Sequence, residues 1–310
     1  MLIALVAHAL GRLAPDTAAR MGAALGILAW RLGLRRRVVC DNLLRTLALR
    51  GWQRRDVARR CYASVGATLM QLGSIGARGV EELSITAMNP HWQELVARRH
   101  PGAVLLTLHQ GSWDINGWAM ARRFPRLLAY ATAQATPAVD AWINACRARL
   151  GMEVVLVRSG DRRGALRVVR GLRGGGLAVG MLADQGPRPE VGSAARFFGQ
   201  PAWCHHGPVF LARKAGVPIV PTVCLRRGWL SFSVFMGRPL HIDGMSDAQA
   251  VQLCMDQIAV LIRAAPGQYF WHHKRFKRAM SAMPPAGVVV CHGRGMAVLD
   301  TADGLDLLRS

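Results

Sequence analysis

The apolar and polar residues follow two different patterns along the chain. Residues 38–79 place apolar side chains at spacings of three or four, a period that predicts helices. From residue 103 onward, short runs rich in Val, Leu and Ile alternate with longer amphipathic stretches. The short runs predict strands at or near 103–108, 127–132, 153–157, 177–182, 218–225 and 230–236. The stretches between and after them predict helices at or near 114–123, 138–150, 162–173, 207–216 and 247–264.

The order of these elements predicts the fold class. Strands that alternate with helices need crossover connections, which cover a sheet with helices. We therefore expect an α/β fold with a central mixed, largely parallel sheet. No repeat of fixed period and no low-complexity linker divides residues 38–280, so we expect one domain there. Residues 281–310 contain Pro284-Pro285 and several glycines, and we expect them to form a carboxyl-terminal appendage of unknown role.

Residues 1–37 are apolar but interrupted. The stretch is divided by Arg12, Pro15, Asp16 and Arg20. No run of about 20 apolar residues therefore remains to span a bilayer. The basic cluster Arg35-Arg36-Arg37 follows the apolar region, whereas a secretory signal has its charge in front. We expect one or two helices in the membrane interface, with the arginines among anionic headgroups. An ordinary pair of core helices and a single tilted span are the alternatives.

Composition adds a strong positive charge. The chain has 40 basic and 18 acidic residues among 310, a formal net charge of +22. Such an excess attracts anionic partners: nucleic acid, acidic phospholipid, a phosphorylated glycolipid or an acidic carrier protein. The charge alone does not choose among them. The three lysines are Lys214, Lys274 and Lys277, so arginine supplies almost all of the basic residues.

The seven cysteines are scattered, and none forms a CxxC pair. An odd number of dispersed cysteines in a chain of this length is typical of a reduced protein on the cytoplasmic side. Cys204, His205 and His206 are possible metal ligands, but no second ligand cluster accompanies them. We therefore expect neither a metal site nor another cofactor.

The segment LLTLHQGSWD places a histidine after a predicted strand. His109 follows the strand that ends at Leu108, and Asp114 comes five positions later. Residues at the carboxyl end of such a strand project into the crevice where ligands bind. A histidine there can take a proton from a hydroxyl, and a carboxylate on its far ring nitrogen fixes the tautomer. We expect Asp114 to be this carboxylate if the intervening loop folds back. A histidine that only packs at a strand end is the alternative.

The longer segment LLTLHQGSWDINGW resembles the His-x4-Asp/Glu motif of glycerolipid-type acyltransferases. It is most similar to the branch that contains the late acyltransferases of bacterial lipid A biosynthesis. Other segments within residues 20–278 resemble motifs of that branch in the expected order. They are Arg35-Arg36-Arg37 with Asp41-Asn42-Leu43, Ala183-Asp184-Gln185, Arg196-Phe197-Phe198-Gly199, and Tyr269-Phe270-Trp271-His272-His273-Lys274-Arg275-Phe276-Lys277. Three features depart from the pattern: Asp114 stands where that branch usually has Glu, Trp203-Cys204-His205 stands where a Thr is common, and the tail after Ser281 has no counterpart.

The resemblance implies an acyltransferase fold and transfer of a fatty acyl group to a hydroxyl of a lipid A precursor or similar glycolipid. The donor would be an acyl thioester, acyl carrier protein or acyl-CoA, and the enzyme would act at the cytoplasmic face of the inner membrane. His109 would be the general base and Asp114 its partner. A lysophospholipid, an amino-acid lipid or a mannosylated phosphoinositide is the alternative acceptor. A non-catalytic basic protein that binds membrane or nucleic acid is a further alternative, although we expect no nucleic acid partner.

Attack on a thioester creates a tetrahedral oxyanion, which needs hydrogen-bond donors. The backbone amides around Gly111 and Ser112 are candidates, because they follow His109 directly. Ser112 itself lacks the GxSxG elbow of an acyl-enzyme nucleophile, so we expect it to cap a helix or to lie in the loop.

Four further residues are candidates for substrate binding. Asp184 and Gln185 follow a predicted strand, and the resemblance makes them part of the acceptor site or the active-site wall; a local turn is the alternative. Arg163 and Arg196 are candidate phosphate contacts or solvated surface residues. The basic residues near the end of the last motif alternate with aromatic ones, which is typical of a membrane-surface, phosphate or nucleic-acid site.

Overall fold

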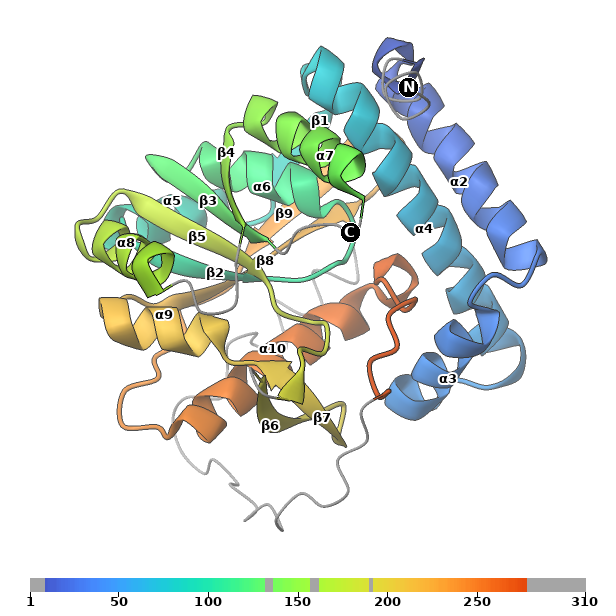
Figure 1. Ribbon diagram of the computed structural model, residues 1–310. Helices are drawn as coiled ribbons and strands as arrows, with labels where there is room; N and C mark the ends of the chain where they lie inside the picture. The colour runs from blue at the N-terminus through green and yellow to red at the C-terminus, as the bar shows by residue number, and fades with distance from the viewer. Residues whose placement is uncertain (1–8, 132–135, 157–161, 190–191, 278–310) are drawn as a thin grey trace.

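A seven-stranded sheet forms the centre of the protein (Figure 1). The computed structural model describes residues 9–131, 136–156, 162–189 and 192–277. The strand order is β1-β9-β8-β2-β5-β3-β4. The bounds are β1 Ser84–Ala87, β2 Ala103–Thr107, β3 Arg126–Ala131, β4 Met152–Leu156, β5 Leu177–Leu182, β8 Ile219–Arg226 and β9 Ser231–Met236. Strands β8 and β9 pair antiparallel and the other neighbours in this sheet pair parallel, so the prediction of a largely parallel sheet is confirmed.

Strand β2 is buried on both faces. Val104 and Leu106 belong to one hydrophobic core, whereas Ala103 and Leu105 belong to the core on the opposite face. Because successive side chains of a strand point to opposite faces, a strand that is covered on both sides needs an unbroken apolar run. This is why the segment Ala103–Thr107 has no alternation of polar and apolar residues.

Helices cover both faces of the sheet (Figure 1). The bounds are α2 Pro15–Arg31, α3 Arg36–Leu47, α4 Gly51–Arg78, α5 Pro90–Arg99, α6 Trp113–Ala121, α7 Pro137–Arg149, α8 Arg162–Arg173, α9 Gly207–Ala215 and α10 Asp247–Ala264. Helices α8, α9 and α10 pack in the core that contains Val104, and α5, α6 and α7 pack in the core that contains Leu105. Helix α4 contributes to both cores, so it joins the amino-terminal helices to the sheet.

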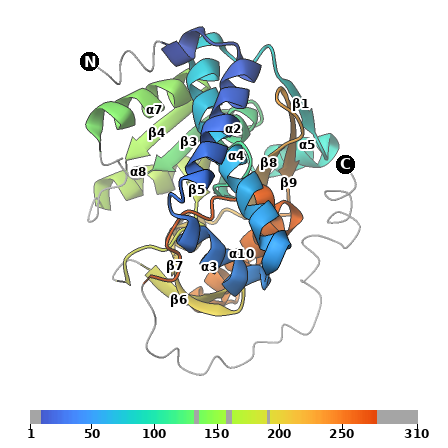
Figure 2. The ribbon, with the colours of Figure 1, turned by 90° about the vertical axis from the view of Figure 1, so that its right-hand side faces the viewer.

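Helix α2 packs closely along α4, on the outside of the molecule (Figure 2). The contact depends on small residues: a Cβ added to Gly66 would lie 2.0 Å from the carbonyl oxygen of Gly22. The two backbones can therefore approach only because both positions are glycine. The other buried residues of α2 are Pro15, Ala18, Ala19 and Ala23. In the part of the chain that the structure describes, no helix combines the length and the apolar character that a membrane span needs.

The β6–β7 hairpin lies outside the main sheet and was not predicted. Strands β6 (Gly192–Phe197) and β7 (Gln200–His205) are joined through Phe198 and Gly199, which have φ values of 53° and 75°. Two such left-handed residues give the turn whose twist fits a hairpin. The strands contain Gly, Ala, Arg and Pro rather than a β-branched run, so their composition gives no strand signal. Strand β1 and helix α5 were missed too, whereas the predicted elements are found within about two residues of their expected ends.

Two expectations concern residues outside the described ranges. The expected appendage, 281–310, lies wholly outside them. The expected membrane segment, 1–37, is described from residue 9 onward, where it forms α2 and the start of α3.

Candidate active site

His109 lies just beyond the carboxyl end of β2, near the middle of the sheet. Its backbone N–H donates to Asp184 Oδ1 at 3.2 Å, and its carbonyl accepts a hydrogen bond from the Phe270 N–H at 2.8 Å. Its imidazole contacts two aromatic rings, with centroids 5.4 Å from Trp113 and 6.0 Å from Phe270. The side chain is 23% exposed, so the ring is fixed by its neighbours and still open to a substrate.

The carboxylate bonded to this imidazole belongs to Asp184. Its Oδ1 lies 2.9 Å from His109 Nδ1, and its side chain is fully buried. Asp184 follows β5, which pairs in parallel with β2, so both residues leave the sheet at the same edge. A carboxylate only accepts hydrogen bonds, so Nδ1 is the donor. In the neutral ring Nε2 is then the basic nitrogen.

Asp184 is held in its ionised form. Burial by itself would raise its pKa, but the charge and the hydrogen bond of His109 outweigh burial, and the pKa lies below its usual value. The neighbouring Tyr269 hydroxyl also lowers the pKa of Asp184. Burial and the nearby Asp184 raise the pKa of Tyr269 well above its usual value, so the phenol keeps its proton and remains a donor. A negative charge behind the imidazole favours the protonated ring that proton transfer would create.

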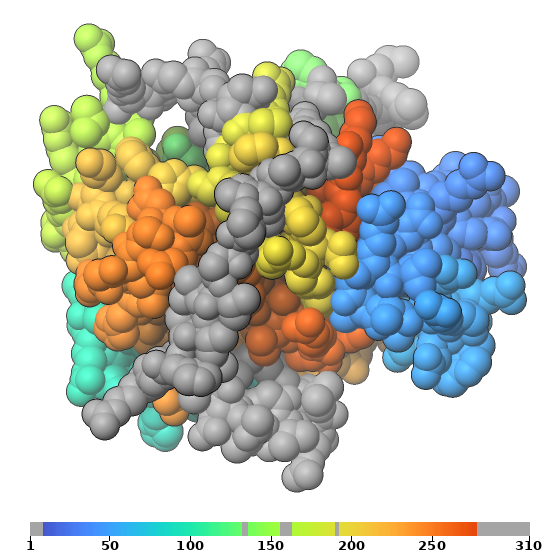
Figure 3. All heavy atoms as spheres, turned by 90° about the horizontal axis from the view of Figure 1, so that it is seen from below, coloured from blue at the N-terminus to red at the C-terminus, as the bar shows by residue number. Residues whose placement is uncertain are grey.

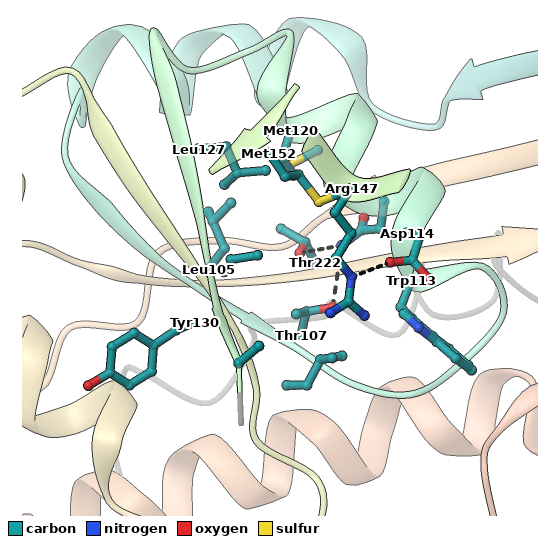
Figure 4. Close-up of a pocket in the computed structure, with 16 residues that line it drawn as sticks. Leu105, Thr107, Trp113, Asp114, Met120, Leu127, Tyr130, Arg147, Met152 and Thr222 are labelled. Atoms are coloured by element: carbon teal, nitrogen blue, oxygen red, sulfur yellow. Dashed lines mark hydrogen bonds and ion pairs between the residues drawn. The ribbon is translucent and has the colours of Figure 1, made fainter. Parts of the chain in front are cut away.

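Asp114 lies in a different environment from the expected one. It is buried in the first turn of α6, and its Oδ1 accepts a hydrogen bond from Arg147 Nε at 2.8 Å (Figure 4). The expectation that Asp114 bonds to the far nitrogen of His109 is therefore corrected, because Asp184 makes that contact. The Arg147 side chain comes from α7 and is 14% exposed. The pair therefore joins α6 to α7. Removal of one partner from a buried ion pair costs about 3–5 kcal/mol in the free energy of unfolding.

The expected oxyanion donors are not free. The Gly111 N–H donates to the Gln268 carbonyl at 3.0 Å, and the Ser112 N–H donates to the Cys224 carbonyl at 2.9 Å. Gly111 has a φ of 59°, and a Cβ there would lie 2.0 Å from the Cys224 oxygen, so the loop is pressed against β8. The expectation that these two amides meet an oxyanion is corrected, since both are already paired. Ser112 precedes α6 as its N-cap residue, although its hydroxyl makes no capping hydrogen bond.

The remaining candidates are placed at different distances from His109. Gln185 Nε2 lies 3.3 Å from His109 Nδ1. We assign the proton on that nitrogen to the hydrogen bond with Asp184. Arg196 lies on the β6–β7 hairpin, where its Nη1 donates to the Gly199 carbonyl at 3.0 Å. Arg163 is exposed in the first turn of α8, which follows edge strand β4. Three strand spacings, about 14 Å, separate β4 from β2, so Arg163 is not brought to the imidazole.

The last motif, residues 269–277, is called here the closing segment. It is tied to the basic amino-terminal motif, more than 200 positions earlier in the chain. Asn42 Nδ2 donates to the carbonyls of Trp271 and His273, both at 2.8 Å, and Arg35 Nη1 donates to the His272 carbonyl at 3.0 Å. The same segment supplies Tyr269 to the site. The two motifs therefore form one structural unit beside the imidazole.

An apolar cavity of about 60 Å³ adjoins this site, between the sheet and α6 (Figure 4). Its walls include Leu105, Met120, Leu127, Met152 and Leu182. Trp113 lines the cavity and also contacts the His109 ring, so the cavity begins one side chain away from the imidazole. Gly180 faces the cavity without a side chain, and a Cβ added there would meet no atom closer than 3.9 Å.

Sequence reasoning missed Arg147 as a buried partner. The only signal is its position: apolar Ile143 and Cys146 on α7 and Leu150 just after it lie near Arg147 in the sequence, so a charge there needs a partner. Cys204, which was considered as a metal ligand, instead accepts a hydrogen bond from Arg275 Nη2 at 3.0 Å. Within the ranges that the structure describes, no three His, Cys, Asp or Glu side chains gather as a metal-binding group.

Comparison with known proteins extends these observations. A model of the bacterial lipid A biosynthesis acyltransferase family matches residues 1–278. The lipid A biosynthesis lauroyltransferase of Escherichia coli (strain K12) is 26% identical over 276 residues, which are 86% of this chain and 87% of that protein. Two phosphatidylinositol mannoside acyltransferases of Mycobacterium tuberculosis, from strains CDC 1551 / Oshkosh and ATCC 25618 / H37Rv, are 29% and 30% identical over 173 residues. These matches cover 55% of this chain and 52% of the mycobacterial proteins.

Proposed function

Because the chain belongs to the bacterial lipid A biosynthesis acyltransferase family and is therefore an acyltransferase, we propose that it acylates a hydroxyl of a lipid A precursor or similar glycolipid. The acyl group comes from a thioester of acyl carrier protein. The observation that supports this chemistry best is the His109–Asp184 contact of 2.9 Å at the carboxyl edge of the sheet. It leaves Nε2 as a base for the acceptor hydroxyl.

The proposed reaction uses only the side chains of this site for proton transfer. Nε2 of His109 takes the proton of the acceptor hydroxyl while its oxygen attacks the thioester carbonyl carbon. The C–S bond of the tetrahedral intermediate then breaks, and the imidazolium returns the proton to the leaving thiolate. Asp184 stabilises the imidazolium between these steps, a task that suits its buried negative charge. General base catalysis of this kind contributes about 10²–10⁴-fold in rate.

The donor and the acceptor are tested together with labelled substrates. Purified protein is incubated with acyl carrier protein or CoA that bears a labelled acyl group, and with a lipid A precursor, a lysophospholipid or a mannosylated phosphoinositide. We expect the label in the glycolipid, and a faster reaction from the carrier protein, whose acidic surface the charge of +22 attracts. Label found in the lysophospholipid alone would overturn the proposed acceptor. The mycobacterial relatives make the phosphoinositide the second candidate.

We further propose that the cavity beside Trp113 receives the acyl chain. Its lining is mainly apolar, although it also includes the Asp114–Arg147 ion pair, and this lining and its position next to the imidazole support the assignment. Gly180→Leu places a side chain from β5 in the cavity. We expect the ratio of the rates for long and short acyl donors to fall by about fourfold for each methylene group that the leucine displaces. The measurement is the ratio of rates for acyl donors of graded length. Gly174→Ala, in the loop after α8 and outside the cavity, is the control; an unchanged ratio in Gly180→Leu would contradict the assignment.

The exposed face of α2 supports attachment to the cytoplasmic face of the inner membrane. Met21, Leu25, Leu28 and Leu32 recur at helical spacing and are 45–67% exposed. They are exposed, unlike the small residues of α2 that are buried, and the basic cluster 35–37 follows closely. An apolar stripe beside arginines is typical of a helix that lies in the interface of an anionic bilayer.

This attachment is tested by Leu25→Asp/Leu28→Asp. In the proposed attachment the bilayer buries these two leucines, and each contributes roughly 1.5–3 kcal/mol to binding. Their loss is expected to lower the partition onto phosphatidylglycerol-containing vesicles by at least about tenfold. Vesicle flotation measures the bound fraction. Leu166→Asp, which changes a leucine of similar exposure on α8, should leave binding intact. Full release of the wild type by high salt alone would contradict an apolar anchor.

A further inference from the structure

One wall of the cavity between the sheet and α6 is polar near the active site. Leu105 and Thr107 line the cavity from the same face of β2, and Thr107 is the nearer of the two to His109. Thr222 lines the cavity from β8 (Figure 4), and Asn116 lines it from α6. Thr107, Asn116 and Thr222 are called here the polar cluster.

The polar cluster is buried, yet its hydrogen bonds are incomplete. Asn116 is 3% exposed and Thr222 is fully buried. Asn116 Nδ2 donates to Thr222 Oγ1 at 3.0 Å and to Thr107 Oγ1 at 3.3 Å, whereas Asn116 Oδ1 has no partner among the described residues. Both threonine oxygens are acceptors in these bonds, so each hydroxyl still has a proton to donate.

A plain hydrocarbon chain is a poor match for this wall. Methylene groups against it would displace water and leave buried polar atoms unpaired, which is costly. A hydroxyl group can donate to Asn116 Oδ1 and accept from a threonine at the same time. The cavity of about 60 Å³ has room for such a group, since one water molecule needs only about 10–15 Å³. The wall therefore suits a chain that has a hydroxyl substituent.

The polar cluster lies on the path from the imidazole into the cavity. On the face shown in Figure 3 the closing segment, in orange-red, lies between the hairpin in yellow and the amino-terminal helices in blue. Phe270 of this segment and Trp113 both contact the His109 ring, and Trp113 also lines the cavity. Thr107 precedes His109 by two residues, about 7 Å of strand, whereas Leu127 lines the cavity from the start of β3. A chain that enters from the imidazole thus meets the cluster with its first carbons.

We propose that the polar cluster recognises a hydroxyl group on the acyl chain of the donor. The donor is then a hydroxyacyl thioester, with the hydroxyl on one of the first carbons after the carbonyl. The hydroxyl donates to Asn116 Oδ1 and accepts from Thr107 or Thr222. This inference rests on the proposed acyl transfer and on the cavity as the acyl site, and it adds the chemical class of the donor.

The test compares acyl, 2-hydroxyacyl and 3-hydroxyacyl thioesters of one chain length. We expect kcat/KM of the wild type to be about tenfold higher for the better hydroxyacyl donor than for the plain donor, because the plain chain leaves buried polar groups unpaired. Thr107→Val/Asn116→Leu/Thr222→Val replaces the whole cluster by apolar groups of similar size and should abolish or reverse this preference. Asn144→Leu, on α7 and outside the cavity lining, should keep it.

A milder variant keeps the test decisive if the triple variant does not fold. Thr222→Val removes one hydroxyl and preserves the shape of the side chain, so we expect the preference for the hydroxyacyl donor to fall by about two- to threefold. A preference that is unchanged in folded Thr222→Val and in the folded triple variant would overturn the proposal.

Binding without turnover separates this inference from the proposed acyl transfer. His109→Ala protein is titrated with the same three thioesters, and their dissociation constants are compared. Equal binding of the plain and the hydroxylated thioesters would overturn the hydroxyl site even if acyl transfer is confirmed. Tighter binding of a hydroxyacyl thioester, lost when the polar cluster is replaced, would support the site even if no acceptor is acylated.

Discussion

Replacement of His109 by alanine is expected to lower kcat for acyl transfer by about 10³-fold or more. The variant lacks the imidazole that we propose as the base for the acceptor hydroxyl, and general base catalysis contributes up to about 10⁴-fold. The rate of transfer from a labelled acyl donor at saturating acceptor measures the effect. The substitution leaves the buried Asp184 carboxylate without its imidazole partner, so the melting temperature is recorded on the same sample and turnover is compared for folded protein only.

A matched control is available for this substitution. His91 is exposed on α5, and His91→Ala should retain wild-type turnover. If His109→Ala keeps its fold and also keeps wild-type turnover, then the imidazole is not the base and the proposed mechanism fails.

Asp184→Asn is expected to lower kcat by about 10³–10⁴-fold while the active site keeps its shape. An asparagine can present its NH2 group to Nδ1, and this favours the tautomer in which Nε2 carries the proton and cannot accept another. The variant also removes the negative charge that stabilises the imidazolium. The measurement is kcat at saturating acceptor and donor, with the melting temperature recorded on the same sample.

Asp114→Asn tests whether Asp114 has a different role from Asp184. It leaves the charge of Arg147 buried without a partner, so its main effect is a loss of about 3–5 kcal/mol in the free energy of unfolding. Asp114→Asn/Arg147→Met removes both charges and should recover much of that stability. If folded Asp114→Asn/Arg147→Met loses turnover as severely as Asp184→Asn, then Asp114 has a catalytic part beyond its ion pair.

Much of the fold could be predicted because its central strands are buried on both faces. Segments such as Ala103–Thr107 and Leu177–Leu182 are short unbroken apolar runs, and the amphipathic stretches between them have helical periods. The β6–β7 hairpin could not be predicted in this way. Its pairing depends on the left-handed conformations of Phe198 and Gly199. The hydrophobic pattern of its strands does not predict these conformations.

The candidate site was predicted only in part, for a geometric reason. His109 was found because it follows a strand directly, and Asp114 was chosen because it is near in sequence. Successive residues of a helix point about 100° apart, so at the start of α6 Trp113 faces the imidazole while Asp114 faces Arg147. Asp184 reaches His109 because β2 and β5 are neighbours in the sheet. A local sequence pattern does not predict the order of the strands.

The tautomer of His109 is the most direct test of the proposed proton transfer. Nitrogen NMR of protein labelled in its histidines reports which ring nitrogen carries the proton, and the difference from His109→Ala assigns the signal. The bond to Asp184 predicts a protonated Nδ1 and a bare Nε2 in the neutral ring, with the preference lost in Asp184→Asn. A wild-type ring protonated at Nε2 with a bare Nδ1 would contradict the mechanism, because no base would then face the acceptor.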